Sequence, residues 1–249
     1  TRRSPLVTPV MLRLAEQALE GGRSEDVKAI VQEFLGGTLP PAVRAWLLLL
    51  NGDAERGDAN RDDARTQYEL AQRADPGSPT AWFAAFRHAQ PNVEMREFAQ
   101  GATELAAVIQ APVAPELRAA ALLLQGDAAY HAGNHALAGA AFRRVLVEFP
   151  GQPGASAARL GQAWADLRQD RREEARREFL EFAAASPDDP HAPDALVLAS
   201  ELTLASDDVE AARQLLDRIL ASHPAHARAE FARLNRAILM IRTGQATAA

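Results

Sequence analysis

A period of 37 residues runs through the chain and constrains its fold more than any other feature. Prolines recur at this interval as Pro150, Pro187 and Pro224. Two further columns keep the same interval: Ala138, Ala175 and Ala212, and Phe142, Phe179 and Leu216. A repeat of this length is typical of a protein built as a stack of similar small units. One unit cannot bury its apolar face alone, so neighbouring units must pack against each other.

Placed on this period, the 249 residues form six units and one further helix, which we interpret as a single solenoid over residues 1–249. The predicted units cover residues 8–44, 45–81, 82–118, 119–155, 156–192 and 193–229, and the terminal helix covers 230–244.

Two columns of this arrangement predict how the units pack. One holds only small residues: Ala15, Gly52, Ala89, Gly126, Ala163, Ser200 and Ala237. The column three residues earlier holds only apolar residues: Leu12, Leu49, Phe86, Leu123, Leu160, Val197 and Leu234. Small residues let two helices approach closely, and apolar side chains one turn away fill the seam between them.

Within a unit, the apolar residues recur with the period of a helix. Ala138, Phe142 and Val145 lie at i, i+4 and i+7, which is one stripe of a helix surface. Residues suited to cap helix N-termini occur at matching positions: Ser24, Asn60, Asn134, Asp170 and Asp207. We therefore expect two helices and two turns in each unit and no β-sheet. In the third unit, we expect Pro91 and Asn92 to interrupt the first helix early.

The pattern of small, aromatic and proline residues resembles the tetratricopeptide repeat (TPR) family. Two units carry it at identical spacing: Gly52, Ala64, Tyr68, Ala71 and Pro76, and Gly126, Ala138, Phe142, Val145 and Pro150. The period of 37 residues departs from the family's usual period of about 34 and is similar to that of bacterial cell-envelope TPR proteins. The resemblance implies an all-α, right-handed superhelical solenoid of antiparallel helix pairs. It also implies a non-catalytic scaffold that binds a peptide or protein partner, within a bacterial multiprotein complex.

Two alternative functions stay open. The chain is either an envelope-assembly or secretion component anchored through an N-terminal segment, or a helical module of a larger enzyme or regulator. Since the chain begins at Thr1 and shows no secretory signal, we expect it to be a processed or trimmed product. The compartment also stays open between envelope and cytoplasm, and the resemblance favours the envelope.

Composition narrows the classes of partner. The formal net charge of −6 disfavours a nucleic-acid partner. No apolar run reaches the roughly 20 residues that a membrane-spanning helix needs, so we expect no direct membrane span. The absence of cysteine excludes disulfides and cysteine-ligated metal sites.

No residue set predicts catalysis, a cofactor or a metal site. His131 and His135 have the spacing of metal ligands on one helix, but Gly133 and Asn134 place a turn between them. Asp188 and Asp189 precede a predicted helix, where carboxylates offset the helix dipole. We expect a protein that is not an enzyme.

The position after each small residue faces the concave groove in TPR proteins, and here this column is mostly acidic. It reads Glu16, Asp53, Gln90, Asp127, Trp164 and Glu201, with Trp46, Phe83 and Tyr130 nearby as apolar anchors. The resemblance therefore predicts a groove for a segment of basic and apolar character. The alternative is that these carboxylates are merely hydrated.

The predicted terminal helix is more apolar than the polar end of a solenoid should be. Its apolar residues are Phe231, Leu234, Ile238, Leu239, Met240 and Ile241. We expect this helix to dock on further units or on a second copy of the chain, and therefore expect a tendency to form homodimers.

Overall fold

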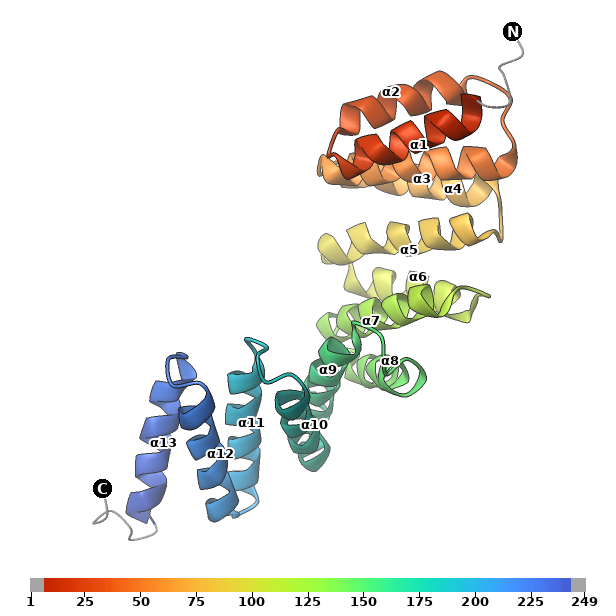
Figure 1. Ribbon diagram of the computed structural model, residues 1–249. Helices are drawn as coiled ribbons and strands as arrows, with labels where there is room; N and C mark the ends of the chain where they lie inside the picture. Colours follow the sequence, from red (N-terminus) through yellow and green to blue (C-terminus); the bar gives the residue numbers. More distant parts are fainter. Residues whose placement is uncertain (1–6, 243–249) are drawn as a thin grey trace. The chain divides into compact units, whose positions relative to one another are not determined.

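The computed structural model describes the backbone of residues 7–242 and the side chains from residue 10 onward. This part of the chain contains thirteen α-helices and no β-strand, so the prediction of an all-α fold is confirmed (Figure 1). Thr1 and positions 243–244, the predicted end of the terminal helix, lie outside the described residues.

The chain divides into two compact units, Thr1–Ala128 and Ala129–Ala249. The first unit contains three helical hairpins, and α7 (Pro115–His131) lies at its end. The hairpins are α1 (Val7–Glu20) with α2 (Ser24–Leu35), α3 (Pro41–Gly57) with α4 (Arg61–Ala74), and α5 (Pro79–Glu94) with α6 (Phe98–Gln110). Consecutive helices from α1 to α6 pack on each other, and α3 also packs on α1 and α5 (Figure 1).

The second unit continues the same order of helices. They are α8 (His135–Glu148), α9 (Ala155–Arg168), α10 (Arg172–Ala185), α11 (Ala192–Ala205), α12 (Val209–Ser222) and α13 (Arg228–Arg242). Consecutive helices pack on each other, and α11 also packs on α13. Pro150, Pro187 and Pro224 each follow the last residue of a helix by two positions, where proline stops the helix. The single solenoid and the boundaries of its six repeats stay a prediction.

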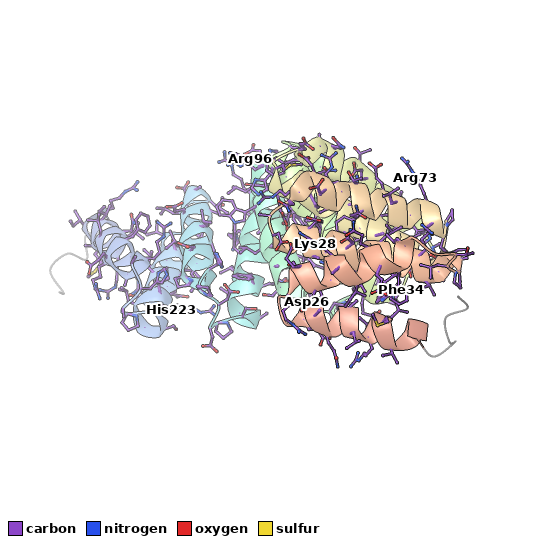
Figure 2. All side chains as sticks on the ribbon, turned by 90° about the horizontal axis from the view of Figure 1, so that it is seen from above. Asp26, Lys28, Phe34, Arg73, Arg96 and His223 are labelled. Carbon is purple, nitrogen blue, oxygen red and sulfur yellow. The ribbon has the colours of Figure 1, made fainter. Side chains whose placement is uncertain are left out.

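Apolar stripes of the helices form a separate core in each unit. In the first unit, Val27, Val31 and Phe34 of α2 pack with Ala15 and Leu47 (Figure 2 labels Phe34). In the second, the core contains Phe179, Phe182, Leu216 and Ile219. Burying each of these large apolar side chains contributes about 2 kcal/mol to stability.

The column of small residues lies where helices approach closely. Ala15, Ala89 and Ala163 have no exposed surface. A Cβ atom at Gly52 would lie 2.5 Å from Cε1 of Tyr68, which is closer than two carbon atoms can approach. This contact explains why the column has glycine at this position. Ala237, the last member, is exposed on α13.

The turn inside each hairpin repeats one backbone conformation at the 37-residue interval. Its central residues have φ between 59° and 81° and are Gly22, Ala59, Arg96, Gly133, Asp170 and Asp207. The N–H of the next residue donates to the carbonyl five positions earlier, at 2.7–3.3 Å in all six turns. This bond and the left-handed residue are those of the Schellman motif, which closes the end of a helix.

The predicted capping residues are correct in part. Asn134 precedes α8 and accepts a hydrogen bond from the Leu137 N–H at 3.1 Å. Asp170 and Asp207 do not cap, because each is the left-handed residue of its turn and the next residue takes the cap position. In α12 this next residue is Asp208, which accepts from the Ala211 N–H at 3.0 Å.

The expected interruption of α5 is wrong, because the helix continues through Pro91 to Glu94. Proline lacks one N–H and therefore removes one helical hydrogen bond, but its carbonyl still accepts from the Met95 N–H at 2.8 Å. The Asn92 side chain is buried and donates to Oε2 of Glu104 on α6 at 2.7 Å. Packing against α6 thus compensates for the lost bond.

Candidate interaction pocket

A cavity of about 260 Å³ lies between α9 and α11 in the second unit. Its apolar lining includes Leu160, Trp164 and Leu198, and its polar lining includes His191, Asp194, Glu201 and Arg228. We call this cavity the α9–α11 pocket. Two of the residues predicted to face a groove, Trp164 and Glu201, lie together in it.

The Trp164 side chain is held in place by the core of the second unit. Its ring packs edge-on against Phe179 of α10, with ring centroids 5.4 Å apart and an interplanar angle of 85°. Phe179 is fully buried, while Trp164 is half-buried and lines the pocket. An aromatic side chain already fixed in this way loses little conformational entropy when a ligand packs on it.

The charged residues of the pocket differ in whether they have a partner. Asp194 forms an ion pair with Arg228 of α13. His191 contacts Asp189 through Nδ1 at 2.9 Å, and the N–H groups of His191 hold the pKa of Asp189 below its ordinary value. Glu201 is exposed and pairs with no cation among the residues that the structure describes. Its carboxylate is therefore available to a basic group of a ligand.

In the first unit, two of the three predicted carboxylates, Glu16 and Asp53, form hydrogen bonds within the protein. Nε1 of Trp46 donates to Glu16 at 3.1 Å, and Arg13 pairs with the other oxygen of Glu16 at 3.2 Å. The Tyr68 hydroxyl donates to Asp53 at 2.8 Å. Burial, together with the negative charge of Asp53, raises the pKa of Tyr68 above its ordinary value of 10.0.

Arg87 of α5 lies against one acidic residue of the predicted column, Asp53. Its Nε lies 3.4 Å from Asp53, and Nη1 donates to Gln90 at 3.1 Å. Its guanidinium lies over the Phe83 ring, 5.0 Å from the ring centre. A cation of the protein itself thus takes the place where we expected a basic ligand.

Other predicted groove residues are not among those that line the pocket. Asp127 is exposed on α7 in the first unit. Tyr130 belongs to the second unit, where its hydroxyl accepts a hydrogen bond from Nε of Arg168 at 3.2 Å. The ring of Tyr130 lies 5.1 Å from that of His135. A single groove formed by all nine predicted residues stays a prediction.

Several residues of the pocket were missed from the sequence. Leu160 belongs to the apolar column and was assigned to the seam between helices, although it also lines the cavity. Asp194 and Arg228 lie 34 residues apart, and their ion pair joins α11 to α13. The opposite charges of these two residues were the only available signal.

The terminal helix α13 has an exposed and a buried side. Leu234, Ile238 and Ile241 are exposed, whereas Leu239 is buried. Phe231 is half-buried and packs against the core of the second unit. Leu239 therefore stabilises the fold and does not belong to the exposed face.

Among the side chains that the structure describes, no group of three or more His, Cys, Asp or Glu residues is arranged to hold a metal ion. None of the helices within residues 7–242 combines the length and apolar character of a membrane-spanning segment.

The model of the family described as "Tetratricopeptide repeat" matches residues 86–153 and 160–227, which together exceed half of the chain. No curated protein matches the chain in sequence.

Solved structures of TPR proteins are similar to the chain in fold. The C-terminal part of a TPR repeat-containing protein from Cytophaga hutchinsonii superposes with a TM-score of 0.74 at 17% identity, covering 90% of this chain and 87% of that one. PilW, described as a type IV pilus biogenesis factor, gives 0.63 at 17% identity over 92% and 99%. YrrB, described as a TPR protein with an unusual peptide-binding site, gives 0.62 at 17% identity over 84% and 98%.

Proposed function

Because the chain belongs to the tetratricopeptide repeat family, whose fold is typical of protein-interaction scaffolds, we propose that it binds a segment of a partner protein in the α9–α11 pocket. In this role the chain is a non-catalytic adaptor within a bacterial multiprotein complex. The likeness to a peptide-binding TPR protein and to a pilus biogenesis factor supports this setting.

One observation carries the proposal: the exposed carboxylate of Glu201, which pairs with no cation among the described residues, lines the same pocket as the fixed ring of Trp164. A partner segment would insert an apolar side chain against Trp164 and pair an Arg or Lys with Glu201. The pocket is smaller than the roughly 300–1,000 Å³ of sites that hold whole small molecules, and its volume suits a single amino-acid side chain.

The ligand chemistry is tested by selecting peptides from a random library displayed on phage against the immobilised chain. We expect the bound peptides to be enriched in Arg or Lys next to a large apolar residue. With the variant Glu201→Arg, the selected peptides should lose their basic residues, because two cations would repel in the pocket. Trp164→Ala should weaken binding of a selected peptide by roughly tenfold or more, as loss of a central aromatic anchor does.

A matched control is Glu174→Arg, which reverses one exposed charge on α10 outside the pocket. It should select the same peptides as the unmodified chain. If Glu201→Arg also selects those peptides, the pocket is not the binding site. If the unmodified chain selects no peptide at all, the proposed function itself is wrong.

A further inference from the structure

Exposed large apolar side chains are concentrated on two helices. In the part of the chain that the structure describes, seven such side chains occur, and five of them belong to α1 and α13. They are Val10 and Leu14 on α1, and Leu234, Ile238 and Ile241 on α13. The other two, Leu70 on α4 and Val147 on α8, stand alone. Clustered apolar residues mark an interaction surface, whereas isolated ones are ordinary.

The apolar residues of α13 form one continuous stripe. Leu234, Ile238 and Ile241 lie at i, i+4 and i+7 and are 62%, 42% and 68% exposed. Ala237, between them, is exposed as well. The opposite side of the helix, including Ala232 and Leu239, packs into the core of the second unit. We call the exposed stripe the α13 face.

The first helix has a shorter stripe of the same kind. Val10 and Leu14 lie at i and i+4 and are 56% and 45% exposed. Ala15, which faces away from Val10, is buried in the core of the first unit. We call the exposed stripe the α1 face.

The two faces lie in surroundings of opposite charge. The hairpin of α12 and α13, residues 209–242, contains six arginines and three acidic residues, a net charge of +3, and one of these arginines, Arg228, is paired with Asp194 of α11. The hairpin of α1 and α2, residues 7–35, contains three basic and five acidic residues, a net charge of −2. Association of the two would bury both apolar stripes and bring opposite charges together, which accelerates and orients binding.

We propose that the α13 face of one copy of the chain packs on the α1 face of a second copy. A symmetric contact between two α13 faces is less favourable, since an antiparallel pair centred on Ala237 and Ile238 places Arg233 opposite Arg242. A dimer held by one contact between an α13 face and an α1 face leaves one α1 face and one α13 face unoccupied, so further copies can add. The assembly therefore grows with concentration, unless it closes as a ring.

The experiment uses two variants of the whole chain, each with one face disabled. Leu14→Glu disables the α1 face, and Ile238→Glu disables the α13 face; both sites are exposed, and circular dichroism checks that the fold is retained. In analytical ultracentrifugation, the unmodified chain should show masses that rise with concentration. Each variant alone should remain a single chain. An equal mixture of the two should form a complex of two chains, since one intact contact remains between them.

The control Val147→Glu, at an exposed apolar site outside both faces, should associate like the unmodified chain. Three results would overturn the proposal. The first is an unmodified chain that stays monomeric at the highest concentration. The second is Leu14→Glu forming dimers alone, which would indicate symmetric pairing through α13. The third is a mixture that gives no complex although each variant is folded.

Discussion

Six residues at the 37-residue interval have a left-handed backbone conformation, and only Gly22 and Gly133 among them are glycine. For a residue with a Cβ atom, this conformation is less favourable by about 1–2 kcal/mol of free energy, because the Cβ approaches the following carbonyl oxygen. Asp170 and Asp207 tolerate it better than Ala59 and Arg96, since a short polar side chain can bond to the local backbone. The Schellman bond of the turn is the same in all six cases, so the turn keeps its conformation whichever residue occupies this position.

The change Ala59→Gly should raise the free energy of unfolding by about 1 kcal/mol, because it removes the Cβ conflict at φ 63°. The measurement is the midpoint of urea unfolding followed by circular dichroism. Gly133→Ala, in the same column at φ 81°, should lower the midpoint. Gly36→Ala is the control, since its φ of −68° suits any residue and it should not lower the midpoint. A lower midpoint for Ala59→Gly would contradict this account of the turns.

Much of the core could be predicted residue by residue, but the turns could not. Ala138, Phe142 and Val145 are all buried, as their helical spacing indicates. The left-handed column mixes Gly, Ala, Arg and Asp, so no residue preference reveals it. For the same reason Asp170 was expected to cap α10, although the helix begins two residues later.

Between elements, a single lysine joins the first two hairpins. Lys28 of α2, labelled in Figure 2, lies 2.7 Å from Asp58, which follows α3, and 3.1 Å from Glu55 of α3. The hydrogen bond from Lys28, and a second from Ser24, hold the pKa of Asp58 below its ordinary value of 3.8. The pKa of Lys28 is raised in turn, chiefly by Asp58. Both shifts mean that the charged forms of Lys28 and Asp58 are favoured in the folded chain at neutral pH.

The variant Asp58→Asn should therefore be less stable than the unmodified chain at neutral pH. A carboxylate with a lowered folded-state pKa stabilises the fold above its ordinary value, 3.8 here, and loses this effect as the pH falls further. The difference in urea midpoint between the two proteins should thus shrink as the pH falls below 3.8. The control is Asp188→Asn, at an exposed carboxylate of another turn. A difference for Asp58→Asn that does not shrink as the pH falls below 3.8 would refute the electrostatic cause.

The acidic column shows what a repeat pattern cannot predict about neighbouring helices. The pattern correctly gave one residue on each first helix, but it carries no information about contacts across helices. Asp53 bonds to Tyr68 and Arg87, which lie 15 and 34 residues away in sequence, and the column identified neither. Glu201 has the same place in the column and lacks such a cation among the described residues. Both carboxylates were predicted from the sequence, but only the structure shows that the one of Glu201 is available to a ligand.

For the whole molecule, the 37-residue period predicted the fold class, because a stack of helix pairs is the arrangement that buries each recurring apolar column. The period could not predict where a ligand binds. Leu160 and Val197 belong to a column present in every repeat, yet here they line the cavity between α9 and α11. A binding site in such a protein depends on local departures from the repeat.

The fluorescence of Trp164 can report directly on a ligand in the α9–α11 pocket. The chain has three tryptophans, and the variant with Trp46→Phe and Trp82→Phe leaves Trp164 as the reporter in the pocket. Titration with a basic peptide from the phage selection should change its emission in a saturable way, and Glu201→Arg in the same variant should abolish the change. Binding of that peptide by calorimetry, without any change in Trp164 emission, would contradict a role of the α9–α11 pocket in partner recognition.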